Sequence, residues 1–274
     1  MSSGYDRIGD GRHTPPNIAA ISYLLGLIGG VGLTTALLCF FRDVPSSAPL
    51  TSWFHFWGSE AQHAPSRWPT FGIYLFLLSL FHFSEYTLQA IFHPKNIDLS
   101  GTPLSGTPNE QDYSRTSVAF MLDHSWEYQV AFLFGTLDTL FFPRWCGAYL
   151  PVIGQYHHVV GGLLLSGGLF CRWAAMVTAK HHFTHHIAVR KDASHTLIQS
   201  GIYRWMRHPS YFGFTLFSAG TQLCLGNLVS FVVFLLVLHR FFADRIQYEE
   251  LLLHRFFGEE WLQYKRRVRY SGLL

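Results

Sequence analysis

The sequence predicts an all-α membrane protein built from six to eight transmembrane helices. Hydrophobic residues make up 49% of its 274 residues, charged residues only 14%, and the mean hydropathy is positive at +0.17. The apolar residues also gather in long blocks, and several blocks are long enough to cross about 30 Å of hydrocarbon as a helix. These observations indicate an integral membrane protein, and none of them points to a nucleic-acid partner.

Six apolar runs account for the predicted helices. The fourth run is the longest and contains Pro151 and two glycine pairs, so it could form one helix or two. That choice contributes to the range of six to eight spans. We assign residues 1–147 to amino-terminal helices and loops, and residues 148–274 to a carboxy-terminal core within one integral domain. The runs cover Asn17 to Phe41, Pro69 to Phe92, Val118 to Phe142, Ala148 to Ala179, Phe212 to Asn227 and Leu228 to Phe242.

The basic residues are unevenly distributed along the chain. Of the 20 lysines and arginines, 12 follow Ala179. Because positively charged flanks stay on the cytosolic side of a membrane, we expect these flanks to face the cytosol. The polar residues before the first run do not resemble a removable signal peptide. Contact with anionic lipid headgroups is expected for Lys265, Arg266, Arg267 and Arg269.

The first half of the chain offers packing and pairing residues rather than a recognisable site. Gly26 and Gly30 have the spacing that lets two helices approach closely. Ionisable groups are expensive in a bilayer, and for those in this half we favour structural pairing or an interfacial position over catalysis. These groups are Glu85, Asp123, His124 and Glu127.

A cluster of histidines follows the fourth run and raises the question of a metal site. His182, His185 and His186 have the spacing of one ligand box of membrane di-iron enzymes. Such enzymes need several boxes, and the sequence supplies no others of suitable spacing. The four cysteines are far apart in apolar sequence, without a zinc or redox pattern. We therefore predict no metal, and expect the histidines to line a polar pocket or lie near headgroups.

Two charged clusters flank the last two apolar runs. Arg207 to Tyr211 precedes these runs, and Arg245 to Glu250 follows them. A hairpin through the membrane returns to the face from which it started, so residues about forty positions apart in sequence can line one pocket. This pattern predicts an enzyme site at a membrane surface.

Each cluster admits a structural interpretation beside a functional one. Pro209 restrains His208 to an extended backbone and should begin the next helix. The free N–H groups of that helix, together with Arg207, could bind an anion or form an ordinary cap. Arg245 and Glu249 stand four positions apart on one helix face and alone would form an ion pair worth about 0.3–0.5 kcal/mol. Opposite the His208 turn, they could instead hold a zwitterionic molecule and an acidic substrate together.

Several short motifs together resemble the isoprenylcysteine carboxyl methyltransferase family. The resemblance extends from Lys180 to Val268. Membrane phospholipid methyltransferases and sterol reductases share the arginine-histidine-proline turn, whereas its combination with the other motifs is more specific. The motifs are Ser194-His-Thr-Leu-Ile, Gly201-Ile-Tyr, Arg207-His-Pro-Ser-Tyr-Phe-Gly, Arg245 to Glu250 and Phe257-Gly-Glu-Glu-Trp-Leu-Gln-Tyr-Lys.

The resemblance implies an activity and a setting for the protein. The implied reaction transfers a methyl group from S-adenosyl-L-methionine to the free carboxylate of a prenylated carboxy-terminal cysteine. The implied partners are processed CaaX proteins such as small GTPases, carrying farnesyl or geranylgeranyl, together with membrane lipid, and no obligate protein partner is expected. About eight spans, a location in the endoplasmic reticulum membrane, and a site and carboxy terminus facing the cytosol are implied as well.

The resemblance also implies roles for particular residues. Arg245 is expected to grip the prenylcysteine carboxylate and Glu249 to complete the cofactor pocket, which makes these two the expected catalytic residues. The family pattern has a glutamine where Ala188 stands, and a proline usually follows Val268 where this chain has Arg269. The expected contacts of S-adenosyl-L-methionine are His185, His195, Thr196, Leu197, Ile198, Tyr203, His208, Pro209, Ser210, Tyr211 and Glu249.

Two other classes of function remain open from the sequence. An NADPH-dependent membrane sterol reductase shares the carboxy-terminal fold, but it should be longer and carry a cysteine-containing tail. A structural or lipid-scaffolding membrane protein would leave the clustered histidine, arginine and glutamate residues unexplained. The sequence lacks the glycine fingerprint of a soluble dinucleotide domain, so a cofactor would have to bind among membrane helices and loops.

Overall fold

Helices make up all the regular secondary structure of the residues that the structure describes. The structure is a computed structural model, and it describes residues 15–43, 68–92, 126–141, 151–185, 187–189, 191 and 195–273. The predicted all-α class is confirmed. The helices are α1 (Pro15–Asp43), α3 (Trp68–Phe92), α5 (Trp126–Phe141), α7 (Pro151–Ala179), α8 (Pro209–Cys224), α9 (Leu228–Phe257) and α10 (Glu259–Arg267), with two short 3₁₀ helices, η3 (Lys180–His182) and η4 (Gly201–Arg204).

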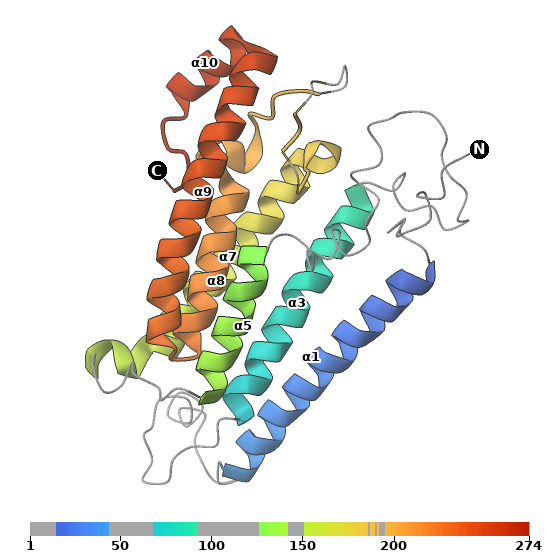
Figure 1. Ribbon diagram of the computed structural model, residues 1–274, viewed down its shortest axis with the longest axis vertical. Helices are drawn as coiled ribbons and strands as arrows, with labels where there is room; N and C mark the ends of the chain where they lie inside the picture. Colours follow the sequence, from blue (N-terminus) through green and yellow to red (C-terminus); the bar gives the residue numbers. More distant parts are fainter. Residues whose placement is uncertain are drawn as a thin grey trace, which may run out of the picture.

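Three of the described helices are long and apolar enough to cross a bilayer. The candidate spans are Ile18–Leu38 in α1, Phe71–Phe92 in α3, and Tyr156–His182, which runs from α7 into η3. Figure 1 shows α1 on the outside of the bundle, next to α3. Large apolar side chains on the outer surface, such as Leu38 and Leu163 with exposed fractions of 65% and 70%, suit a lipid environment. The chain is a membrane protein, and these spans correspond to the first, second and fourth apolar runs.

The described part of the fourth apolar run forms one continuous helix, α7, so the alternative of two elements is wrong. Its glycine pairs do not break the helix, and one glycine of each pair, Gly161 and Gly168, is a contact point for α8. A β-carbon added at Gly161 would lie 2.2 Å from the backbone nitrogen of Cys224, and one added at Gly168 would lie 2.4 Å from that of Phe217. Gly220 of α8 approaches the α7 backbone in the same way. The two backbones therefore lie closer together than a side chain would permit.

A similar contact joins α1 to α3, but it uses glycines other than those that the sequence indicated. A β-carbon added at Gly32 would lie 2.4 Å from the carbonyl oxygen of Gly72. One added at Gly26 or Gly30 would meet no atom within 4 Å among the described residues. The predicted packing role of Gly26 and Gly30 is therefore wrong, because both glycines are exposed on the outer side of α1.

The last two apolar runs form the predicted hairpin, in which α8 and α9 are joined by a short turn. Helix α5 caps the start of α9, because the Asp138 carboxylate accepts hydrogen bonds from the Ser230 backbone N–H, at 3.2 Å, and from the Ser230 hydroxyl. The Asn227 side-chain amide donates to the Thr139 hydroxyl at 2.8 Å. Helix α5 covers the described part of the third run, whose residues 118–125 and 142 lie outside the described chain.

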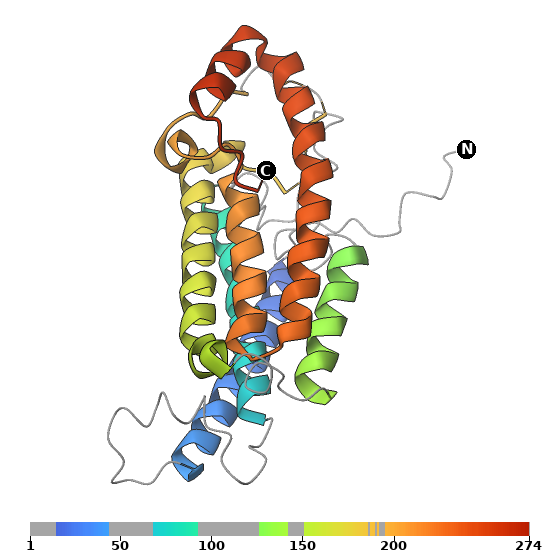
Figure 2. The same ribbon diagram turned by 90° about the vertical axis from the view of Figure 1, so that its left-hand side faces the viewer.

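Helix α9 extends past the start of α8, and α10 folds over its end (Figure 2). The segment Val268–Gly272, which we call the return segment, then runs back to the turn that begins α8. The backbone N–H of Arg207 donates to the carbonyl oxygen of Tyr270 at 3.1 Å, and that of His208 donates to the carbonyl oxygen of Ser271 at 2.8 Å. Both charged clusters of the sequence therefore meet at one end of the bundle, as predicted.

Candidate functional site

A cavity of about 520 Å³ lies between the helices and continues to the end where the charged clusters meet. Its volume falls in the range of about 300–1,000 Å³ that is usual for small-molecule sites. Polar side chains from the α8 turn and from the distal half of α9 line one part. Apolar side chains line the rest, contributed by α3, α5, α8 and the proximal half of α9: Leu78, Phe81, Val130, Phe134, Phe217 and Phe234 are among them. The cavity therefore offers a charged end and an apolar interior.

Helix α8 begins at Pro209 as the sequence predicts, but the expected extended backbone of His208 is wrong, because its ψ lies well below the extended range. His208 is the residue before the helix, with φ of −124° and ψ of 62°, and Pro209 occupies the first helical position. Proline is suited to that position because its fixed φ is helical and its missing N–H would have had no partner there. The start of α8, including Pro209 and Ser210, lines the cavity. The positive end of the helix dipole thus lies at the polar part of the cavity.

Tyr211 joins the two charges of the α9 cluster. Its hydroxyl donates to Glu249 Oε2 at 2.6 Å and accepts from Arg245 Nε at 3.0 Å. Arg245 Nη2 also donates to the backbone oxygen of His185 at 2.7 Å. Within the described part of the chain, Arg245 Nη1 and Glu249 Oε1 have no hydrogen-bond partner. Both residues line the cavity, so the site presents one donor and one acceptor of opposite charge to a ligand.

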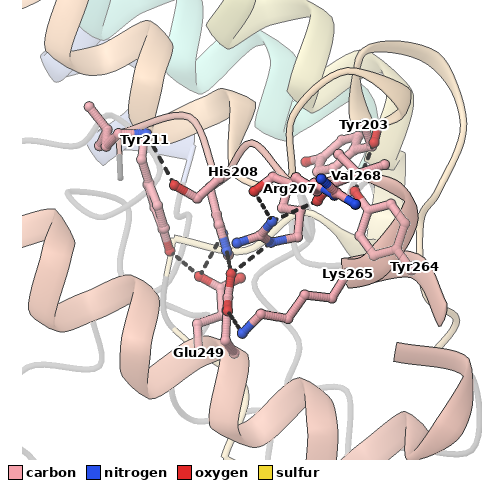
Figure 3. A network of polar contacts seen from close by, with 12 residues as sticks. Tyr203, Arg207, His208, Tyr211, Glu249, Tyr264, Lys265 and Val268 are labelled. Carbon is pink, nitrogen blue, oxygen red and sulfur yellow. Dashed lines mark hydrogen bonds and ion pairs between the residues drawn. The ribbon is translucent and has the colours of Figure 1, made fainter. Parts of the chain in front are cut away.

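Glu250, the neighbour of Glu249, is the centre of a second polar network. It accepts hydrogen bonds from Arg207 Nε at 2.8 Å and Lys265 Nζ at 2.7 Å, and His208 Nε2 lies 3.3 Å away. Figure 3 shows Arg207, His208 and Lys265 converging from the turn and from α10. Burial alone would raise the pKa of Glu250, but the hydrogen bonds from His208, Lys265 and Arg207 outweigh burial and lower that pKa to about 2. Glu250 is therefore ionised at neutral pH, beside the site.

The imidazole of His208 lies between these two carboxylates. Its Nδ1 is 3.7 Å from Glu249 Oε2, on the opposite side from the contact with Glu250. The ring stacks on Tyr211, with centroids 5.6 Å apart and planes 5° from parallel. The position of His208 thus depends on both α9 carboxylates and on the Tyr211 ring.

Two tyrosines close the cavity on the side of η4 and α10. The hydroxyl of Tyr264 donates to the backbone oxygen of Tyr203 at 2.8 Å. Burial raises the pKa of Tyr203, and the Glu249 carboxylate raises it further. Burial also raises the pKa of Tyr264, to about 12. Both phenols stay neutral, so they supply hydrogen bonds and ring surface rather than charge.

A buried ion pair links the amino-terminal helices to the site. Glu85 of α3 accepts two hydrogen bonds from Arg172 of α7, from Nε at 2.7 Å and from Nη2 at 2.9 Å. Arg172 Nη1 also donates to the Ser210 hydroxyl at the start of α8, at 2.8 Å. The predicted structural pairing of Glu85 is confirmed. Arg172 was not predicted, although it is the one lysine or arginine in the fourth apolar run, which marks a basic residue that needs a partner.

The structure brings most of the predicted site residues to this cavity. His195 is half-buried and is not among the described residues that line it. Ser194 and His186 lie outside the described chain, as do Asp123 and His124. The residues that do line the cavity are His185, Thr196, Leu197, Ile198, Tyr203, His208, Pro209, Ser210, Tyr211, Arg245 and Glu249.

Other cavity residues had no signal in the sequence or only a weak one. Trp261 and Tyr264 lie within a motif that the sequence analysis quoted, but their role in closing the cavity depends on how α10 folds back. The apolar walls from α3 and α5 come from runs without any motif. In the described part of the chain, no group of three or more histidine, cysteine, aspartate and glutamate side chains is arranged to hold a metal.

Comparison with known proteins agrees with the resemblance of the motifs. Residues 161–255 match the model of the isoprenylcysteine carboxyl methyltransferase family. The chain is 37% identical over 245 residues to the protein-S-isoprenylcysteine O-methyltransferase of Homo sapiens, with 86% of this chain and 78% of that protein covered. It is 35% identical over 206 residues to the protein of the same name from Saccharomyces cerevisiae, with 74% and 79% covered.

A solved structure shows the same fold. The eukaryotic intramembrane Ras methyltransferase, an isoprenylcysteine carboxyl methyltransferase, matches with a TM-score of 0.63 and 24% identity, covering 93% of this chain and 96% of that one. Identity at this level is informative about the fold alone. The human and yeast relatives, each above 30% identity over more than two thirds of its length, settle the relationship. This chain belongs to the isoprenylcysteine carboxyl methyltransferase family.

Proposed function

We propose that this chain methylates the carboxy-terminal carboxylate of prenylated cysteine, with S-adenosyl-L-methionine as the methyl donor. The observation that carries the proposal is the pair Arg245 and Glu249. The two residues are joined by Tyr211, and each presents an unused hydrogen-bonding atom in a cavity that is otherwise largely apolar. A substrate with one carboxylate and one long hydrocarbon group matches this cavity, because the carboxylate suits the charged end and the hydrocarbon suits the apolar interior.

The prenyl group suits the apolar walls of the cavity. Burying each CH₂ of such a chain contributes about 0.8 kcal/mol, so the hydrocarbon supplies most of the binding energy. Aromatic side chains such as Phe81, Phe217 and Phe234 provide that surface. The substrate carboxylate would then lie at the polar part of the cavity, near Arg245. A guanidinium binds a carboxylate in a fixed orientation, which suits a group that must be aligned.

The methyl donor suits the remaining part of the polar end. Glu249 would pair with its amino group, and the start of α8 would receive its carboxylate. The rings of Tyr203 and Tyr211 provide surface for the adenine or for the positively charged sulfur. When bound, S-adenosyl-L-methionine supplies the methyl group and departs as the uncharged thioether.

The reaction needs orientation more than proton transfer. A carboxylate has an ordinary pKa of about 3–4, so the substrate arrives ionised and no general base has to activate it. Arg245 would hold one carboxylate oxygen and leave the other to attack. Tyr211 fixes Arg245 relative to Glu249, and thereby fixes the two ligand positions relative to each other.

The setting of the enzyme is also part of the proposal. Placing the α8–α9 hairpin and the third apolar run in the bilayer, beside the three candidate spans, gives six spans, the lower end of the expected range of six to eight. The basic flanks favour a cytosolic site, and the eukaryotic relatives favour the endoplasmic reticulum membrane. Small GTPases ending in a processed CaaX sequence are the proposed protein substrates.

Transfer of labelled methyl to N-acetyl-S-farnesylcysteine tests the proposal directly. Purified protein in detergent or lipid should form a base-labile methyl ester, and Arg245→Ala should lose at least about 100-fold in kcat/KM because the carboxylate is no longer aligned. Arg240→Ala is the matched control, since the side chain of Arg240 on the same helix is 82% exposed. Absence of transfer by folded wild-type protein, or full activity in Arg245→Ala, would contradict the proposal.

A further inference from the structure

The return segment holds the turn before α8 through main-chain contacts. Two backbone N–H groups of the turn, those of Arg207 and His208, donate to carbonyl oxygens of this segment. Arg207 adds two more contacts, because its Nη1 donates to the backbone oxygens of Val268 at 2.6 Å and Arg269 at 2.7 Å. Residues about sixty positions apart in sequence are thus joined by four hydrogen bonds.

Glu250 connects the return segment and the turn to the other elements at this end of the bundle, the end that we propose faces the cytosol. Its carboxylate contacts Arg207 and His208 of the turn and Lys265 of α10, so one anion connects α9, α10 and the start of α8. The Glu250 side chain is 11% exposed, and Arg207 is 7% exposed. Removing one partner from such a buried charged cluster leaves the others uncompensated, so the members are expected to act as a unit.

Glu250 and the return segment, which hold the turn, lie outside the cavity. Arg207, His208, Pro209 and Ser210 line it, whereas among the described residues neither Glu250 nor any member of the return segment does. Apart from Val268, which packs against the cavity residues Trp261 and Tyr264, the return segment can therefore affect a ligand through the turn. It would do so by fixing the direction of the first turn of α8 and the position of the His208 ring.

Gly272 packs closely against the start of α8. Its φ of +119° is one that side chains rarely adopt, and an added β-carbon would lie 3.1 Å from the carbonyl oxygen of His208. The neighbouring Arg269, by contrast, is exposed and contributes a backbone carbonyl to the contact. Because the contact at position 269 is made by a backbone carbonyl, it does not require a particular side chain there. This is consistent with an arginine at the position where the family pattern has proline.

From these contacts we infer that the return segment and Glu250 are positioning elements for the methyl-donor site, and that they set its affinity through the Arg207–Ser210 turn. The inference rests on the proposed function, because it concerns the site to which that function assigns the donor. It identifies Glu250 and Gly272 as positioning residues. Neither is expected to touch substrate or donor.

Separate KM values for the two substrates test the inference. Gly272→Val, which displaces the return segment, should raise the KM for S-adenosyl-L-methionine by about tenfold or more, corresponding to the loss of one or two hydrogen bonds that hold the turn. The KM for N-acetyl-S-farnesylcysteine should change less than about twofold, since the apolar walls are untouched. Arg269→Ala is the matched control and should behave as wild type.

A second variant and a binding measurement complete the design. Glu250→Gln keeps the shape of the side chain and removes its charge, and it should raise the same KM and weaken binding of S-adenosyl-L-homocysteine to the purified full chain. If Gly272→Val does not fold, Glu250→Gln alone tests whether the turn sets the affinity for the methyl donor. Wild-type KM values in Glu250→Gln, or an equal rise of both KM values, would overturn the inference. Wild-type protein that transfers no methyl would instead contradict the proposed function.

Discussion

Tyr211 connects the two ligand-binding charges through one hydroxyl group, which makes it the most direct test at the scale of single residues. Tyr211→Phe removes this hydroxyl and keeps the ring that stacks on His208. Hydrogen bonds to charged groups are worth about 1.5–3 kcal/mol, so kcat/KM should fall by about 10- to 100-fold. Steady-state methyl transfer measures the loss. Tyr248→Phe is the control because Tyr248 is 50% exposed on α9, and an equal effect there would show that the hydroxyl of Tyr211 has no special role.

The ionised Glu250 makes a contribution to stability that depends on pH. Its pKa in the folded protein is about 2, below the ordinary value of 4.5. A carboxyl group with a lowered pKa stabilises the fold above the ordinary value, and this contribution is lost as the pH falls through the folded value. We expect the Tm to fall between about pH 4.5 and pH 2, and to fall less in Glu250→Gln. Thermal unfolding in detergent measures it, and parallel curves for both proteins would contradict the assignment.

At this scale the sequence predicts which residues carry charge at the site, but not how they are arranged. The positions of Arg245 and Glu249 around one helical turn could be recognised, and an ion pair between them was a reasonable alternative. The hydroxyl of Tyr211 between them, 34 and 38 positions away in sequence, depends on tertiary packing that no local pattern reports. The role of Glu250 was hidden for the same reason, because its partners come from two separate parts of the chain, the turn before α8 and helix α10.

The close contact of α7 and α8 is the feature to test at the scale of elements. Gly168→Val should destabilise the protein by at least about 1–3 kcal/mol, because a side chain there would overlap the backbone of Phe217. Gly167→Val is a matched control one position away, where an added β-carbon meets no atom within 4 Å among the described residues. Thermal unfolding of both variants should show a lower Tm for Gly168→Val alone. Equal Tm values would mean that the two helices separate readily.

Helix positions were predictable from the apolar runs, whereas helix partners were not. The glycine pairs of α7 could be read as breaks or as contact surfaces, and only the packing of α8 against them decides the matter. In α1, the spacing of Gly26 and Gly30 indicated a contact, but the contact formed on another face, through Gly32. Small residues at suitable spacing are frequent in apolar helices, so spacing alone cannot identify the face that meets a neighbour.

The ion pair of Glu85 and Arg172 is the test at the scale of the whole molecule, because it joins α3 to the core of the site. Glu85→Gln leaves a buried guanidinium without its counter-charge, which should cost about 3–5 kcal/mol of stability. The double variant Glu85→Gln with Arg172→Gln should lose less than Glu85→Gln alone. Thermal unfolding of the three proteins measures the coupling. A double variant less stable than the single one would mean that the charges contribute independently.

The whole-molecule arrangement was predictable in outline from two sources. Composition indicated a helical membrane protein, and the charged clusters around the last two runs indicated where the site would form. The participation of the amino-terminal helices in the cavity was not predictable, since α3 and α5 contribute apolar side chains without any motif. Glu85 was the one sign of it, as an ionisable residue within an apolar run whose partner the sequence did not identify.

The buried pair also bears on how members of this family can diverge. A substitution at position 85 that leaves the arginine at position 172 exposes an uncompensated buried charge, so the two positions are expected to change together during evolution. A relative that lacks the helix equivalent to α3 would have to supply another carboxylate or dispense with the arginine. A protein that keeps the carboxy-terminal motifs together with Arg172 therefore also needs a carboxylate to neutralise that arginine, as Glu85 of α3 does in this chain.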